Sequence, residues 1–392
     1  MDNSPLPLPH PDAIAHSQHL VDLIRQDINN QADGRISFVE FMNKALYTPN
    51  LGYYSSSIRK FGAEGDFITA PEISPLFSQC LAKQCQQVLA SFDEGVILEF
   101  GAGSGIMAAD ILKALESMNE LPKQYLILEL SADLQLRQQE TLQTQVPHLL
   151  DRVKWLKSLP IEPLQGVILA NEVLDAMPVQ RFRLDEQGVS EYYVSLGDND
   201  ETPFIWETIS SSDKSLLATV EALRPSLDVG YSSELNLALP AWIQSLSDIL
   251  SDGLVLLIDY GFPSREYYHP QRNQGTLMCH YKHYAHDNPL ILVGLQDITA
   301  HVDFTAVAES AHASGLDVSG YTNQANFLLS SGLAELLSGF NPNDSQNYLE
   351  QTQAAKKLIM PHEMGELFKV MALSRNLDMP LLGFTKDERI RL

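Results

Sequence analysis

Apolar runs alternate with amphipathic helical patterns along most of the chain. Residues 96–100 (VILEF) form the clearest apolar run, and they lead into a turn with glycine at every second position, Gly101, Gly103 and Gly105. Behind this turn, residues 106–118 carry apolar side chains at the i, i+3, i+4, i+7 spacing of a helix with one buried face. The pattern predicts a buried strand, a tight turn and a helix.

The same alternation continues through the rest of the chain. Further strand-like runs lie at residues 125–130, 153–156, 166–172, 253–261 and 368–373, and helical spacing recurs at 74–91, 131–143 and 302–314. Residues 179–194 alternate apolar and polar positions about a central Glu-Gln-Gly, which predicts a β-hairpin. Strands that alternate with helices predict an α/β fold around a mostly parallel sheet.

The remaining segments are expected to surround this core. Residues 1–12 contain four prolines and predict an extended arm, whereas residues 13–29 and 38–47 predict helices, the second capped by Ser37 with Glu40 three residues later. We expect an N-terminal part of the chain, residues 1–92, with this arm, its helices and a covering loop. The core then spans residues 93–392, with a helical cap inserted at 197–252 and a helical segment at 322–358. Residues 262–300 resemble a long loop.

The net charge of the chain limits the classes of molecule that the protein is expected to bind. The chain has 26 Lys and Arg against 50 Asp and Glu, a formal net charge of −24. Such a surface repels polyphosphates, so nucleic acid and anionic membranes are not expected as partners. A basic protein or peptide would be attracted, although acidity that serves only solubility is the alternative. No apolar run approaches the ~18 residues of a membrane span.

Cysteine usage points to a reducing compartment. Cys80, Cys85 and Cys279 are too few for a disulfide framework and are not spaced as a zinc site, so buried, reduced thiols are expected. The first 20 residues contain neither a secretory pattern nor an arginine, which predicts a cytoplasmic protein. Histidines scattered over residues 269–301 match no compact ligand set, so no metal is expected.

The glycine turn is the first candidate binding site. Its spacing is G-x-G-x-G, unlike the dinucleotide fingerprint G-x-G-x-x-G, and no Lys-Ser/Thr pair follows that would make it a P-loop. Glu99, two residues before Gly101, suits a ligand with an ammonium group and no pyrophosphate, such as S-adenosylmethionine (SAM). An ordinary glycine-rich turn explains these residues equally well. Glu129, at the end of the next strand, favours the cofactor because a carboxylate there accepts hydrogen bonds from ribose hydroxyls.

Two other groups of polar residues are placed where binding residues gather. Asn171, Glu172 and Asp175 cluster at the carboxyl end of the run 166–172, and open α/β sheets bind ligands at that edge. Residues 65–74 place two acids, an aromatic and a hydroxyl on a loop just before a helix. Taken alone, this loop is better explained as a turn followed by a helix cap.

Several stretches together resemble the MidA family of class I SAM-dependent methyltransferases. They are residues 65–74 (GDFITAPEIS), 97–105 (ILEFGAGSG), 110–112 (DIL), 125–131 (YLILELS), 171–179 (NEVLDAMPV), 259–261 (DYG), 296–304 (QDITAHVDF), 327–329 (FLL) and 364–370 (MGELFKV). The glycine motif marks the wider superfamily, and the first, fifth and seventh stretches are specific to this family. The family includes the mitochondrial complex I assembly factor that acts as a protein arginine methyltransferase.

This resemblance implies a seven-stranded, Rossmann-like SAM methyltransferase sheet with helical additions. It also implies methyl transfer to an arginine of a partner protein. The residues that it assigns to the cofactor are Glu99, Gly101 and Gly103 at the methionine end, Asn171 near that end, Glu129 at the ribose, and Phe67, Thr69, Pro71 and Glu72 in a loop that closes over it. Gly105, the last glycine of the turn, is also expected to bind the cofactor. The chain departs from the family at Met278 and His280, where relatives often have Arg and Tyr, so its choice of substrate is expected to differ if these positions help to form the substrate channel.

An arginine acceptor requires carboxylates, because a guanidinium with a pKa above ~12 is a poor nucleophile while it is protonated. We expect Glu172 and Asp175, and next Glu72, to orient it and help remove a proton around transfer. For Asp175, capping a following helix and bonding loop backbone is an equally good explanation. Two alternatives stay open, a non-catalytic SAM-binding assembly factor and a small-molecule methyltransferase. The expected partner is a protein with an accessible arginine, and a homodimer is left open.

Overall fold

The computed structural model describes residues 6–56, 69–200, 202–341 and 344–392. The chain forms two compact units. Unit 1 comprises Met1–Phe67, Asp175–Ala238 and Arg265–His301, and unit 2 comprises Ile68–Leu174, Leu239–Ser264 and Val302–Leu392. These units do not follow the expected division at residue 92, because the N-terminal segment packs with two later segments of the chain.

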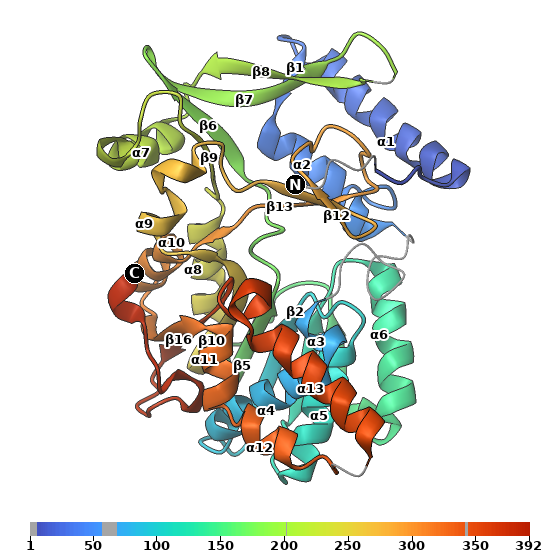
Figure 1. Ribbon diagram of the computed structural model, residues 1–392, viewed down its shortest axis with the longest axis vertical. Coiled ribbons are helices and arrows are strands. Elements are labelled where there is room, and N and C mark those ends of the chain that lie inside the picture. The colour runs from blue at the N-terminus through green and yellow to red at the C-terminus, as the bar shows by residue number, and fades with distance from the viewer. Residues whose placement is uncertain (1–5, 57–68, 201, 342–343) are drawn as a thin grey trace. The chain divides into compact units, whose positions relative to one another are not determined.

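Unit 2 is built on a sheet whose main path has the strand order β15-β16-β10-β5-β2-β3-β4, with the short β14 beside β10 (Figure 1). The strands are β2 (Val96–Phe100), β3 (Gln124–Leu128), β4 (Val153–Leu156), β5 (Leu164–Asn171), β10 (Leu250–Phe262), β14 (Val302–Asp303), β15 (Asp317–Asn323) and β16 (Phe368–Arg375). The central pairs are parallel, whereas β16 runs antiparallel to β10 and β15. This main path confirms the predicted seven-stranded Rossmann-like sheet.

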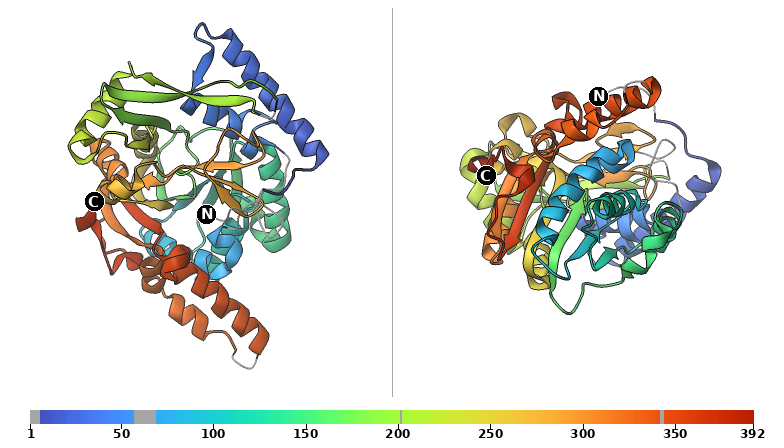
Figure 2. Two further views of the ribbon diagram at one scale, coloured as in Figure 1. Left: turned by 45° about the horizontal axis from the view of Figure 1, so that its top comes forward. Right: turned by 90° about the horizontal axis from the view of Figure 1, so that it is seen from below.

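Helices cover both faces of this sheet (Figures 1 and 2). The helices of unit 2 include α3 (Ala70–Ile73), α4 (Pro75–Leu89), α5 (Ile106–Ser117), α6 (Ala132–Gln145), α8 (Leu239–Ile249), α10 (Phe304–Ala313), α11 (Gln324–Ser330), α12 (Leu333–Ser338) and α13 (Ser345–Ile359). Ile97 belongs to the apolar cluster that includes residues of α4 and α5, while the Phe100 ring contacts Trp242 of α8 at 5.6 Å between centroids. Because β2 is buried on both faces, its sequence is a continuous apolar run rather than an alternating one.

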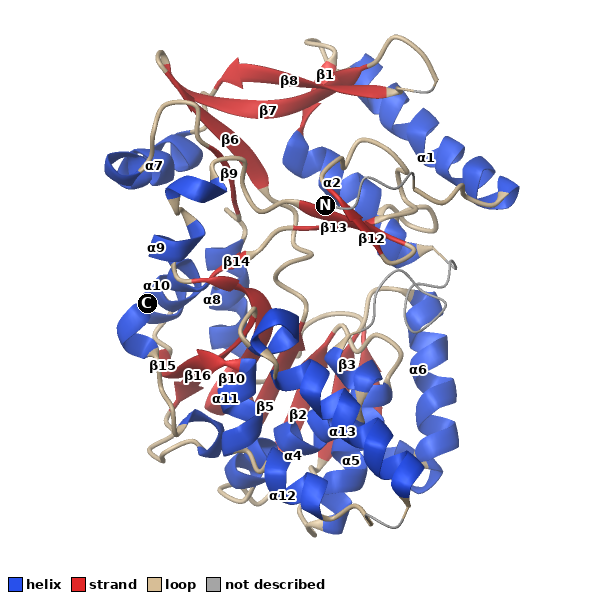
Figure 3. Ribbon diagram, in the orientation of Figure 1, coloured by secondary structure: helices blue, strands red, loops and turns tan. Residues whose placement is uncertain are grey.

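Unit 1 contains two smaller sheets (Figure 3). Its strands are β1 (Arg35–Ser37), β6 (Gln180–Asp185), β7 (Gly188–Leu196), β8 (Phe204–Ser210), β9 (Ser232–Leu235), β11 (Met278–Tyr281), β12 (Tyr284–His286) and β13 (Asp297–Thr299), and its helices include α1 (Pro11–Asn30), α2 (Phe38–Tyr47) and α7 (Lys214–Leu223). Strands β6 and β7 form the predicted hairpin. The predicted cap of α2 is also present, since the Ser37 Oγ accepts a hydrogen bond from the Glu40 N–H at 3.4 Å.

Three segments differ from the sequence prediction. Residues 197–252, expected to be helical, include β8 and β9 as well as α7 and α8, and residues 262–300, expected to be a loop, include β11, β12 and β13. The helical segment expected at residues 322–358 includes the helices α11, α12 and α13, but its first two residues belong to the end of β15. Gly332 separates α11 from α12 with φ +89°, a left-handed conformation that ends a helix. In the part of the chain that the structure describes, no helix is long and apolar enough to cross a membrane.

Candidate active site

The glycine turn between β2 and α5 exposes its backbone. Gly101, Gly103 and Gly105 have φ of +62°, +53° and +83°, conformations that an L side chain rarely adopts. Gly101 is exposed, Gly103 is half-buried, and α5 begins directly after Gly105. The turn is joined to the end of β3, where the Gly101 N–H donates to the Leu128 carbonyl at 3.1 Å. A ligand can therefore lie against bare main chain in front of a helix N-terminus.

Glu99 lies beneath the surface, two residues before the turn. Its side chain is 1% exposed, and its Oε2 accepts a hydrogen bond from the Tyr125 hydroxyl at 2.6 Å. Burial raises the pKa of Glu99 to about 7, an effect that the Tyr125 hydrogen bond opposes and the charge of Glu129 reinforces. Glu99 is therefore buried directly before the turn, with its carboxylate hydrogen-bonded to the neighbouring strand β3.

Glu129 follows β3 and is held from several directions. Its Oε1 accepts from the Ser131 N–H at 2.9 Å, and its Oε2 accepts from the Gln138 side-chain amide at 3.0 Å. The carbonyl of Glu129 also accepts from the Gln135 side chain at 2.6 Å. The next residue, Leu130, is 80% exposed, so its apolar side chain lies on the surface beside the buried carboxylate.

The turn after β5 carries Asn171 and Glu172. Glu172 has φ +53°, an uncommon conformation for a residue with a side chain, and its N–H donates to the Ile258 carbonyl at 2.9 Å. The Asn171 Nδ2 donates to Glu172 Oε1 at 3.1 Å, while Asn171 Oδ1 is buried with no hydrogen-bond partner among the described residues. Asp259 of β10 fixes this turn, because its Oδ2 accepts from the Leu174 N–H at 2.9 Å.

Glu72 contacts the glycine turn from α3. The Ser104 hydroxyl donates a hydrogen bond to Glu72 Oε1, so this carboxylate lies beside the turn. Thr69 caps α3 with its carbonyl, which accepts from the Glu72 N–H at 3.0 Å, and Pro71 is buried in the first turn. The assignment of Phe67 lies outside the described residues.

Asp175 belongs to unit 1, since the chain crosses between the units after Leu174. Its side chain is 4% exposed, and its carbonyl accepts from the Ala300 N–H at 3.0 Å. The alternative role of Asp175 as a helix cap is wrong, because the chain continues through a turn into β6 rather than into a helix. The Tyr54 hydroxyl donates to Asp297 Oδ1 at 2.8 Å. Burial raises the pKa of Tyr54, and the charges of Asp297 and Asp175 raise it further.

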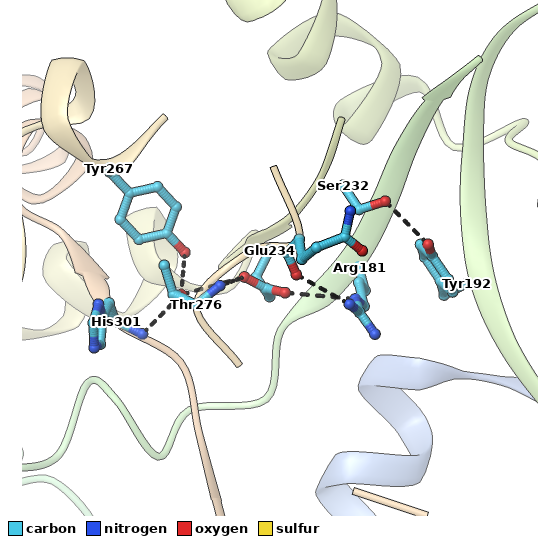
Figure 4. Close-up of polar contacts among 8 residues, drawn as sticks. Arg181, Tyr192, Ser232, Glu234, Tyr267, Thr276 and His301 are labelled. Carbon is cyan, nitrogen blue, oxygen red and sulfur yellow. Dashed lines mark hydrogen bonds and ion pairs between the residues drawn. The ribbon is translucent and has the colours of Figure 1, made fainter. Parts of the chain in front are cut away.

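A second buried polar network lies within unit 1 (Figure 4). Glu234 of β9 is 1% exposed, and its Oε1 lies 3.5 Å from Nε of Arg181 on β6. The Thr276 N–H donates to Glu234 Oε2 at 2.7 Å, and the Thr276 hydroxyl accepts from the His301 N–H at 3.1 Å. Gly275 has no room for a Cβ, which would lie 2.2 Å from Glu234 Oε1. This network therefore fixes the loop that leads into β11.

The two departures from the family both lie on β11. Met278 is half-buried, and burial lowers the pKa of His280, with a smaller contribution from His286. As predicted, Cys80, Cys85 and Cys279 are buried and unbridged. Among the described residues, no group of three or more His, Cys, Asp or Glu side chains is arranged to hold a metal ion.

Sequence reasoning missed two residues of this site. Gln138 donates a hydrogen bond to Glu129, and Leu130 follows Glu129 in the chain. Asp259, which holds the turn after β5, lies in one of the stretches that resemble the family, residues 259–261. A signal for Gln138 was present, because it falls between Leu134 and Leu142 on the buried stripe of α6. A glutamine in the middle of an apolar stripe needs buried hydrogen-bond partners.

The site fits a nucleoside cofactor with a charged amino-acid tail. The open glycine turn, the strand-end carboxylate of Glu129 and the unpaired Asn171 oxygen all belong to unit 2, at the carboxyl ends of parallel strands. A sheet of this order with this site defines the class of Rossmann-like SAM-dependent methyltransferases.

Comparisons with known proteins give the family. Residues 80–322 match the family described as "Putative S-adenosyl-L-methionine-dependent methyltransferase", and the chain belongs to that family. It is 44% identical to a COG1565 superfamily member from Burkholderia thailandensis, crystallised with S-adenosyl-homocysteine, with a TM-score of 0.94 over 99% of this chain and 100% of that one. The resemblance to the MidA family and the assignment of SAM as cofactor are thereby confirmed.

Curated relatives extend the similarity to animals. The chain is 28% identical to protein arginine methyltransferase NDUFAF7, mitochondrial, of Danio rerio, over 91% of this chain and 90% of the fish protein. It is 26% identical to the Homo sapiens protein of the same description, over 88% of this chain and 81% of the human protein.

Proposed function

We propose that this protein methylates an arginine side chain of a partner protein, with SAM as the methyl donor. The similarity to relatives described as protein arginine methyltransferases, over nine-tenths of the chain for the fish protein, is the observation that supports this acceptor. The acidic balance of the chain, −24, agrees with a cationic substrate.

The cofactor is assigned to unit 2. The backbone of the turn from Gly101 to Gly105 faces the methionine part, with Thr69 and Pro71 beside it, and the charge of Glu99 acts on it from below. Asn171 Oδ1, unpaired among the described residues, is positioned to accept a hydrogen bond from an ammonium group. Glu129 accepts from the ribose, since a carboxylate with two bonds already made retains lone pairs for more. Leu130 offers an apolar surface to the adenine ring.

SAM supplies an electrophilic methyl group on a sulfonium sulfur. As the new N–C bond forms and the C–S bond breaks, the arginine nitrogen must lose a proton, and the residues of unit 2 assigned to hold the guanidinium and take this proton are Glu172 and Glu72. The same role for Asp175, which belongs to unit 1, stays a prediction. Glu172 is half-buried and directly follows β5, at the edge of the sheet where ligands of α/β folds bind. The hydrogen bonds of Asn171 and Ser104 orient the carboxylates of Glu172 and Glu72, which places them before the substrate binds.

A labelling experiment tests this function. The pure protein is mixed with methyl-labelled SAM and a lysate from cells that lack the protein. One labelled protein band whose hydrolysate contains methylarginine is the expected result. Label confined to small molecules would favour a small-molecule methyltransferase, and no label despite binding of S-adenosylhomocysteine would favour an assembly factor without catalysis.

Two glycine variants provide the matched control. Gly103→Val forces a β-branched residue into φ +53° within the site, whereas Gly34→Val does the same at φ +66° in unit 1, where no atom lies within 4 Å of the added Cβ. Both variants are expected to lose about 1–3 kcal/mol of stability from backbone strain. Only Gly103→Val should lose labelling and binding; equal losses in both would contradict the cofactor assignment.

The compartment and the biological role stay predictions. The relatives are described as mitochondrial proteins, whereas the three unbridged cysteines of this chain predict only a reducing compartment. A role in respiratory complex assembly, and a homodimer, are expectations that the identity of the labelled protein and a measurement of molecular mass in solution would test.

A further inference from the structure

We propose that Gln138 is a positioning residue that couples the glycine turn to the ribose-binding carboxylate of Glu129. The inference rests on the cofactor site proposed above and adds a residue that does not itself touch the cofactor. Gln138 is fully buried on α6, the helix that begins after Glu129.

The side-chain amide of Gln138 joins three parts of unit 2. Its Nε2 donates to the Gly103 carbonyl at 3.1 Å and to Glu129 Oε2 at 3.0 Å. Its Oε1 accepts from the Trp155 indole N–H of β4 at 2.9 Å. One amide therefore links the turn after β2, the acid after β3 and the edge strand β4.

The indole of Trp155 fixes which way this amide points. An indole N–H only donates, so the amide oxygen must face Trp155, and both amide hydrogens are then directed at Gly103 and Glu129. The reversed amide would place its oxygen against a carbonyl and a carboxylate, which are both acceptors. Glu129 is thus held in one orientation by a donor that cannot turn away.

Close packing keeps α6 against the turn. A Cβ on Gly105 would lie 2.9 Å from the Cα of Gln138, so the helix and the turn are in direct contact. The turn faces the methionine end of the cofactor and Glu129 faces the ribose. Gln138 therefore sets the spacing between the two ends of the cofactor site, which a methyl donor needs in order to place its methyl group.

Binding of S-adenosylhomocysteine and of its 2′-deoxy analogue, measured by calorimetry, tests this role. The wild type should prefer the ribose ligand by about 10- to 100-fold, since a hydrogen bond to a charged group has that effect on affinity. In Gln138→Leu, affinity for S-adenosylhomocysteine should fall by about tenfold or more, and the preference for the ribose ligand should shrink by at least about threefold. A residue that served only to stabilise the fold would lower both affinities equally.

The control is Gln139→Leu, the same chemical change at the adjacent, exposed position of α6, which should leave both affinities unchanged. If the leucine variant of Gln138 does not fold, Gln138→Asn, whose amide is too short to reach both acceptors, is judged by the same ratio. An unchanged ribose preference in the folded variant overturns the role of Gln138. Failure of the wild type to bind S-adenosylhomocysteine would instead overturn the cofactor site itself.

Discussion

Burial controls the protonation of Glu99, and this makes the stability of the protein depend on pH. The pKa of Glu99 is about 7 in the folded protein, against 4.5 for an ordinary glutamate, chiefly because the side chain is desolvated. Between these two values the folded state keeps a proton that the unfolded state has released. The stability that this bound proton contributes is therefore fully present below about pH 4.5 and is lost as the pH rises through about 7.

Replacement of Glu99 by Gln should remove this decline. In the wild type, this group is expected to lower the unfolding free energy by up to about 3 kcal/mol between pH 5 and pH 8. In Glu99→Gln this part of the fall should be absent. Urea unfolding at several pH values measures the slope, and Glu186→Gln, the same change at an exposed position, is the control. An identical pH dependence in wild type and Glu99→Gln would show that Glu99 is not the titrating group.

At the residue scale, the sequence predicts which residues belong to the candidate site better than it predicts their burial and their hydrogen-bond partners. Glu99 and Glu129 were assigned from their position relative to the strands, and both lie where those strands end or nearly end. Their burial, and the amide that holds Glu129, depend on α6 packing against the turn. Such a contact joins residues about 35 positions apart and leaves no local pattern beyond one glutamine on an apolar stripe.

At the scale of elements, the buried pair of Arg181 and Glu234 ties β6 to β9. The Arg181 guanidinium also lies over the rings of Tyr192, at 4.7 Å, and Trp206, at 5.3 Å from the ring centroids, so it is stacked as well as paired. Burial raises the pKa of Glu234, and Arg181 is the first of the groups that lower it. Removal of the cation would leave a desolvated carboxylate, which is costly in the interior of a protein.

Arg181→Met should therefore destabilise unit 1 by about 3 to 5 kcal/mol, with a larger loss at pH 8 than at pH 5 because the unpaired carboxyl resists ionisation. Unfolding in urea, followed by tryptophan fluorescence, gives the free energy. The double variant Arg181→Met with Glu234→Gln should recover part of the loss, since no charge is then buried. A double variant less stable than the single one would contradict this account.

The same scale shows which elements the sequence could predict. Strands β2, β5 and β10 are apolar runs buried on both faces, and their residues indicate them directly. Strand β15 contains Gly320 among mostly polar residues and was predicted in part as helix, because its place is set by pairing with β16 and by the Phe384 ring against Gly320. The short strands β11, β12 and β13 were missed for a similar reason, since three or four residues give too little period to recognise.

At the scale of the whole chain, the sequence does not show which segments fold together into one unit. The chain enters each unit three times, so unit 1 unites residues from its beginning, middle and later part. A division by position along the chain separates residues that fold together. Several of the family stretches were still recognised, because residues 97–105, 125–131 and 171–179 each span the end of a strand and the residues that follow it, which are local to the motif.

The charge of the whole chain leads to a prediction about its substrate. With a net charge of −24, the protein should attract a basic partner over distances comparable with the Debye length, which is ~10 Å at 0.1 M salt and shorter at higher salt. The rate at which the labelled band appears should therefore fall several-fold, by about three- to tenfold, between about 50 and 300 mM NaCl. S-adenosylhomocysteine carries one positive and one negative group, so its affinity, measured in the same buffers, should change little and serves as the control. Labelling that is insensitive to salt while this affinity stays constant would mean that the acidic surface serves solubility, and that the substrate is recognised through contacts at the site alone.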